Sequence, residues 1–166
     1  MSLVWLTSSF GYYLILSLIN TFDEIYITGL TSSFSEIISY VVGGYFFEKA
    51  GVKLSLIVCF GISTFGGILI MSWGLQHQES FMFFIVFLFT KFGVSCTFMI
   101  CFVANSYFFP TLFAATAIGF CYFMARFVTI FSYPISNIDE PWPMIIFTSF
   151  CALTCFACFF LRSAPT

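Results

Sequence analysis

Three ionisable residues, Glu36, Lys91 and Arg126, interrupt long apolar stretches of this 166-residue sequence. A charge at the centre of a membrane-spanning helix costs roughly 2.5 to 3.5 kcal/mol on insertion scales, so it usually faces a bundle interior or a water-filled cavity. The three residues are therefore candidates for a path taken by an ion or a polar solute. The structural alternative is that Glu36 pairs with Lys91 or Arg126 only to hold helices together, or that Lys91 extends its ammonium to the membrane surface.

The composition of the chain indicates whether water or lipid surrounds it. Hydrophobic residues make up 61% and charged residues 7% of the sequence, whereas a soluble domain has roughly 25% charged residues. A water-soluble fold would expose more apolar surface than the few hundred Å² that monomers usually tolerate. We therefore expect an all-α, polytopic membrane protein with the lipid bilayer as a partner. The net charge of −2 is too small to indicate a nucleic-acid partner.

The apolar stretches predict the number of membrane spans. A helix needs about 20 mostly apolar residues to cross the hydrocarbon core. Six such runs are separated by short polar breaks, at residues 3–22, 25–47, 54–73, 81–108, 112–133 and 144–161. The short connections leave no room for a soluble domain, so we expect residues 1–166 to form a single six-helix transmembrane bundle.

The basic residues outside the spans predict the orientation. Lys49, Lys53 and Arg162 would all be cytoplasmic if the amino terminus is cytoplasmic, as the preference of Lys and Arg for that side requires. We therefore expect both termini to be cytoplasmic, in the plasma membrane or alternatively in an organelle membrane. The opening segment has no basic region before its apolar run and is predicted to be a first span rather than a secretory signal.

The polar residues give no indication of catalysis. No nucleophile, base and orienting group form a recognisable pattern, and the single histidine, His77, falls in a predicted loop. The seven cysteines lie in apolar stretches without zinc-site spacing, so we expect small buried or lipid-facing side chains rather than disulfides. We expect no enzyme, no cofactor and no metal.

A motif covers the second predicted span and the loop that follows it. Residues 36–53 read EIISYVVGGYFFEKAGVK. This segment resembles the organic ion transporters of the major facilitator superfamily, whose eighth helix carries Glu-x-Pro-Ala-Tyr and ends in an Asp-Arg-x-Gly-Arg-Arg loop at the same spacing. The resemblance implies a cytoplasmic loop motif made of Gly44, Glu48, Lys49, Gly51 and Lys53. Gly51 would permit a tight turn, while the charged residues would stabilise one gate state.

Further residues are similar to other helices of the same family. Lys91-Phe92-Gly93, Phe109-Pro110-Thr111, Gly119, Cys121, Ala125-Arg126 and Pro134 resemble the tenth and eleventh helices, and Trp5 with Tyr12-Tyr13 resembles the seventh. The resemblance covers almost the whole chain and implies that Glu36, Tyr40, Lys91 and Arg126 line a substrate cavity. In the family, arginine at the Arg126 position accompanies anion or zwitterion carriers, so these solutes are favoured.

The chain also departs from the family pattern. Tyr107 replaces a glutamate, Ala114 replaces an arginine and Val52 replaces a loop arginine, which removes part of the cytoplasmic charge network. The resemblance extends only to the carboxy-terminal half of the family, whose members bind solute between two six-helix halves.

The resemblance to only one half of the family leaves two main candidate functions. The first is alternating-access transport of a small organic solute, with a second six-helix half supplied by another chain or by a longer gene product. The alternative is a transport-inactive structural subunit of a larger membrane complex, and a channel is a more distant third possibility.

Overall fold

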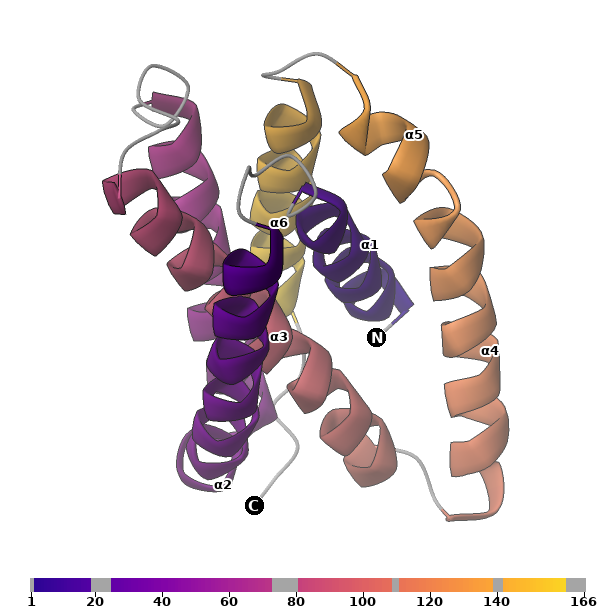
Figure 1. Cartoon of the computed structure of the whole chain (residues 1–166). Helices are drawn as coiled ribbons and strands as arrows, with labels where there is room; N and C mark the ends of the chain where they lie inside the picture. Colours follow the sequence, from indigo (N-terminus) through magenta and orange to yellow (C-terminus); the bar gives the residue numbers. More distant parts are fainter. Residues whose placement is uncertain (1, 19–24, 73–80, 109–110, 139–141, 161–166) are drawn as a thin grey trace.

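The residues that the structure describes form helices with short turns and no strand. A computed structural model describes residues 2–18, 25–72, 81–108, 111–138 and 142–160; His77 and Arg162 lie outside these ranges. The elements are α1 (Ser2–Leu18), α2 (Ile25–Ser72), α3 (Phe81–Phe108), α4 (Thr111–Thr129), α5 (Ser132–Ser136) and α6 (Trp142–Phe159) (Figure 1). The predicted all-α class is confirmed.

Several helices are long and apolar enough to cross a membrane. In the described part of the chain, four segments meet this condition: Gly29–Ser72, Phe83–Ser106, Leu112–Ser136 and Trp142–Phe159. Helix α1 is close to this length, with 17 residues. These helices are those of a membrane protein, as the composition predicts, whereas the count of six spans and their topology remain predictions.

Helix α2 extends through the region where two separate spans are predicted, at residues 25–47 and 54–73. It has 48 residues and is broken at Gly51, whose φ of 75° and ψ of 169° are not helical. The Ser55 hydroxyl donates a hydrogen bond of 3.2 Å to the carbonyl of Phe46, nine residues earlier. An uninterrupted helix would separate these residues by about 13 Å, so the chain turns back at Gly51 (Figure 1). We call residues 25–50 the first arm and residues 52–72 the second arm.

Helix α3 packs against both arms of α2 through small residues. The Cys96 thiol donates a 3.0 Å hydrogen bond to the carbonyl of Ser39 on the first arm. On the second arm, a Cβ added to Gly93 would lie 3.1 Å from the carbonyl oxygen of Cys59. Close approach of this kind is typical of membrane helices, which gain little from hydrophobic association and depend on tight packing.

Helix α1 lies at the centre of the described bundle and contacts α3, α4, α5 and α6. Trp5 is fully buried and meets the ring of Phe102 at a centroid distance of 4.6 Å. The hydroxyl groups of Thr7 and Thr154 are joined by a buried hydrogen bond of 2.7 Å. The Thr7 hydroxyl thus finds its partner inside the bundle, as a low-dielectric surrounding requires, whereas the indole nitrogen of Trp5 is buried without a hydrogen-bond partner among the described residues.

Helix α4 lies at the edge of the bundle. The apolar segment Leu112–Ser136, which includes most of α4 and all of α5, has only 11% of its most apolar 18 residues buried. Helix α4 contacts α1, where the Cys121 thiol lies 3.9 Å from the Ser2 hydroxyl, and both Cys121 and Ala125 are buried. The other cysteines also lie in helices: Cys59, Cys96, Cys101, Cys151 and Cys158 are buried and Cys155 is partly buried. This placement agrees with the prediction that they are small packing residues.

Candidate functional site

The carboxylate of Glu36 is held by two tyrosine hydroxyl groups. Glu36 lies in the first arm of α2, and its Oε1 accepts a 2.7 Å hydrogen bond from Tyr12 of α1. The same oxygen accepts a 2.5 Å hydrogen bond from Tyr40, one turn further along the first arm. Side chains four residues apart on a helix face the same way, so this spacing directs Tyr40 toward the carboxylate. Oε1 is thereby fixed from two helices.

Lys91 of α3 provides the opposite charge. Its Nζ lies 3.8 Å from Oε2 of Glu36, which is an ion-pair distance but too long for a hydrogen bond. The ammonium donates its hydrogen bond to Ser32, one turn before Glu36, and lies 5.9 Å from the centroid of the Tyr12 ring. We call Tyr12, Ser32, Glu36, Tyr40 and Lys91 the carboxylate cluster.

The carboxylate cluster is nearly removed from solvent. The side chain of Lys91 is 3% exposed and that of Glu36 is 18% exposed. Two charges in such surroundings are stable only when both are paired and hydrogen-bonded, and here hydroxyl groups from α1 and α2 meet that need. The pair itself joins α2 to α3.

Arg126, Tyr13 and Tyr122 form a second group of residues, which we call the arginine cluster. The guanidinium of Arg126 donates hydrogen bonds to the hydroxyl of Tyr13 on α1 and, at 2.6 Å, to that of Tyr122 one turn earlier on α4. The Cζ atom lies 4.9 Å from the Tyr13 ring centroid and 4.8 Å from the Tyr122 ring centroid. Within the described residues no carboxylate pairs with Arg126, and its side chain is exposed.

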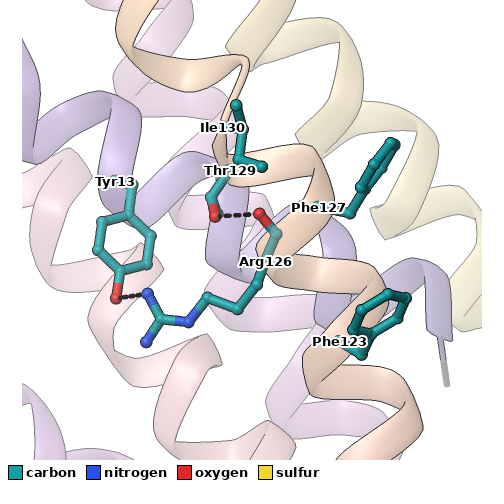
Figure 2. A pocket seen from close by; sticks show the side chains of 6 residues that line it. All are labelled: Tyr13, Phe123, Arg126, Phe127, Thr129 and Ile130. Atoms are coloured by element: carbon teal, nitrogen blue, oxygen red, sulfur yellow. Dashed lines mark hydrogen bonds between the residues drawn. The ribbon is translucent and has the colours of Figure 1, made fainter.

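An open pocket lies beside the arginine cluster. Figure 2 shows Arg126 and Tyr13 turned toward each other at its wall. The pocket has a volume of about 470 Å³ and is lined by Tyr13, Phe123, Arg126, Phe127, Thr129 and Ile130. This size falls in the range of small-molecule sites, and such sites combine mostly apolar walls with a few polar groups. A guanidinium beside aromatic rings suits a solute that has an anionic group and an apolar body.

The structure divides the predicted substrate-binding residues between the two clusters. Glu36, Tyr40 and Lys91 come together, whereas Arg126 lies in the arginine cluster. The clusters are connected by the neighbouring residues Tyr12 and Tyr13, whose rings meet edge to face at a centroid distance of 5.4 Å. Binding of a substrate by these residues remains a prediction.

The predicted cytoplasmic loop motif surrounds the turn in α2. Gly51 makes the turn through its positive φ, and the Lys49 ammonium lies 4.7 Å from the centroid of the Tyr45 ring. Glu48 and Lys49 are exposed and Lys53 is half-buried; among the described residues Glu48 has no ion-pair partner. Gly44 packs under α3, where an added Cβ would lie 3.4 Å from Cε of Met99.

Sequence reasoning did not assign a role to four polar residues of the site: Tyr12, Tyr13, Ser32 and Tyr122. Ser32 precedes Glu36, and Tyr122 precedes Arg126, by four residues. That spacing places each hydroxyl on the helix face that carries the charged residue. The four-residue spacing is therefore the sequence pattern from which Ser32 and Tyr122 could have been identified as partners. The tyrosine pair on α1 could be connected to the charges only through the packing of three helices.

No protein-family model matches this chain, and no curated protein matches it. Any assignment of function therefore starts from the two clusters and the pocket.

Proposed function

We propose that the chain forms one half of a secondary transporter that carries small organic anions or zwitterions by alternating access, together with a second six-helix half. The observation that carries this proposal is the guanidinium of Arg126 at the wall of an open, aromatic pocket. Arginine forms paired hydrogen bonds with a carboxylate through its planar donors. The rings of Phe123 and Phe127 would contact the apolar body of the solute.

The exposure of Arg126 supports an aqueous or protein-covered surrounding for the pocket. Arg126 lies inside an apolar segment, Leu112–Ser136, that is long enough to cross a membrane. A guanidinium in contact with lipid at that depth would be costly. A second half placed over α4 would give Arg126 a shielded, hydrated cavity, which is where transporters of this kind bind their solutes.

The carboxylate cluster has a separate role in this proposal. Glu36 and Lys91 tie α2 to α3 through an ion pair, while Tyr12 extends the connection to α1. Alternating access requires helices to change their contacts between two states. A pair held at 3.8 Å without a direct hydrogen bond can separate at lower cost than a hydrogen-bonded pair. We assign Glu36 and Lys91 to selectivity or coupling.

The proposed topology places both termini and the Gly51 turn on the cytoplasmic side, in the plasma membrane. It is supported by Lys49 and Lys53, which flank the turn, because basic residues in short loops favour that side. The loop motif around the turn would then contact the cytoplasmic end of a neighbouring helix in one of the two states.

The test is uptake by vesicles that contain the chain with its co-purified partner. Saturable uptake of benzoate or betaine is expected, and Arg126→Ala should abolish it while leaving membrane insertion intact. Arg126→Lys keeps the charge without the planar fork and should retain part of the uptake. The matched control is Phe156→Ala, which removes an exposed ring from α6 and should leave uptake unchanged. Unchanged uptake in Arg126→Ala would contradict the proposal.

A second candidate function is that of a transport-inactive structural subunit. It is favoured by the internal pairing of the carboxylate cluster, where Lys91 and Glu36 already have partners on neighbouring helices. Gentle detergent extraction followed by native mass measurement separates the candidates. A pair of halves indicates a carrier, whereas stoichiometric association with a large complex indicates a structural subunit.

A further inference from the structure

An apolar stripe runs along the outer side of the first arm of α2. Leu30, Phe34, Ile38 and Val41 are between 57% and 69% exposed. They recur at intervals of three or four residues, which places them on one face of a helix. Glu36, by contrast, is directed to Tyr12 on α1. The first arm therefore has an inner face with the ion pair and an outer face without charge.

Tyrosines mark both ends of this stripe. Tyr26 is 94% exposed and Tyr45, which follows it by 19 residues, is 59% exposed. At a rise of about 1.5 Å per residue, they are separated by roughly 28 Å along the helix. The hydrocarbon core of a bilayer is about 30 Å thick, and tyrosine is enriched at both of its boundaries. The stripe thus has the length of one bilayer core.

The polar groups on and beyond the stripe agree with contact to lipid. The exposed Ser33 donates its hydroxyl hydrogen bond to the carbonyl of Gly29 on the same helix, at 2.9 Å. Groups that face hydrocarbon must be satisfied internally in this way. At the other end, the Lys49 ammonium lies over the Tyr45 ring, one turn past the end of the stripe, where a headgroup layer would begin.

We infer that the face between Tyr26 and Tyr45 is a lipid-contact surface that crosses the full hydrocarbon core and is not covered by another protein. Glu36 lies midway between the two tyrosines, so the surface places the Glu36–Lys91 pair at the centre of the bilayer. The inference concerns seating in the membrane and holds whether or not the chain transports a solute.

The experiment measures fluorescence quenching by brominated phosphatidylcholine in vesicles that contain the full chain with any co-purified partner. The indole introduced by Phe34→Trp should be quenched at least twofold more by bromine near the acyl-chain ends than by bromine near the headgroups. The indole introduced by Tyr26→Trp should show the reverse order. Both variants are made in a background that carries Trp73→Phe and Trp142→Phe, because Trp142 is 58% exposed and would add its own quenching. The remaining Trp5 is fully buried and should resist quenching, so the background protein without an introduced indole serves as the control.

Two results would overturn the inference. If neither brominated lipid quenches the indole of Phe34→Trp, a protein covers the face; if aqueous acrylamide quenches it, the face borders water. Ile38→Trp, on the same stripe, repeats the measurement if Phe34→Trp does not fold.

Discussion

Glu36 and Lys91 lie 3.8 Å apart, yet the ammonium of Lys91 donates its hydrogen bond to Ser32. The carboxylate in turn accepts its hydrogen bonds from Tyr12 and Tyr40. Each charge is thus solvated by hydroxyl groups, and the attraction between the charges is added to that solvation. Because hydroxyl groups can serve either member of the pair, the two charges should depend on each other less than in a bidentate salt bridge.

Loss of the lysine charge should destabilise the bundle. Lys91→Met leaves a largely buried carboxylate without its cation, which costs about 3 kcal/mol of unfolding free energy at the lower end of the range for broken buried pairs. The lower end applies because Glu36 is 18% exposed. Unfolding in detergent micelles, followed by circular dichroism, measures this loss.

A double variant checks that the loss comes from the pair. Glu36→Gln keeps acceptors for the tyrosines and removes the charge, so the combination with Lys91→Met should recover about 1.5 kcal/mol relative to Lys91→Met alone, within the usual range of coupling energies. Strictly additive effects would show that the two charges do not interact.

Removal of the Tyr12 hydroxyl should weaken the hold on Glu36. The hydrogen bond of Tyr12 is made to an ionised group, and such bonds contribute about 1.5 to 3 kcal/mol. Tyr12→Phe should lower the unfolding free energy by that amount. Tyr45→Phe is the matched control, because Tyr45 is exposed and its ring contact with Lys49 survives; its effect should stay within about 0.5 kcal/mol. Equal effects of the two variants would contradict the assignment.

The turn at Gly51 should not tolerate a side chain. Its φ of 75° and ψ of 169° fall in a region that is essentially restricted to glycine, where other residues cost about 1 to 3 kcal/mol. Gly51→Ala should reduce the unfolding free energy by this amount. Gly61→Ala serves as the control, since Gly61 is in the same element with nothing within 4 Å of an added Cβ, and it should be neutral or stabilising by up to about 1 kcal/mol.

The contact of α3 with the second arm should be equally sensitive to size. A Cβ at Gly93 would lie 3.1 Å from both the Cys59 carbonyl oxygen and Cγ2 of Ile62. Overpacking of this kind typically costs about 1 to 3 kcal/mol, so Gly93→Ala should lower the unfolding temperature in detergent. Gly119→Ala, with nothing within 4 Å, should not. A stable Gly93→Ala protein would mean that α3 and the second arm pack less closely than described.

Much of the secondary structure could be predicted because hydrophobicity alone determines it. Runs of about 20 apolar residues have few alternatives to a helix in a membrane, and α3, α4 and α6 lie where spans were expected. A break between residues 47 and 54 was also predicted from the polar residues there, and the resemblance implied the tight turn at Gly51. The structure differs from the prediction in one respect: the two predicted spans at residues 25–47 and 54–73 are continuous in α2. The reason is that the chain reverses at Gly51 alone, without an intervening loop.

The candidate site was less accessible to prediction. Charged residues are conspicuous in an apolar sequence, so Glu36, Lys91 and Arg126 could be selected directly. Their partners could not, because Tyr12 and Ser32 are ordinary residues that matter only after α1, α2 and α3 pack together. The pairing of Glu36 with Lys91 rather than Arg126 likewise depends on which helices are neighbours.

The hydrogen bond between Thr7 and Thr154 joins residues that are 147 positions apart. During synthesis, the hydroxyl of Thr7 cannot meet this partner until residue 154 has left the ribosome. The partners of α1 in α3, α4 and α5 are thus synthesised before its partner in α6, and a nascent chain that stops before α6 leaves the Thr7 hydroxyl without this hydrogen bond.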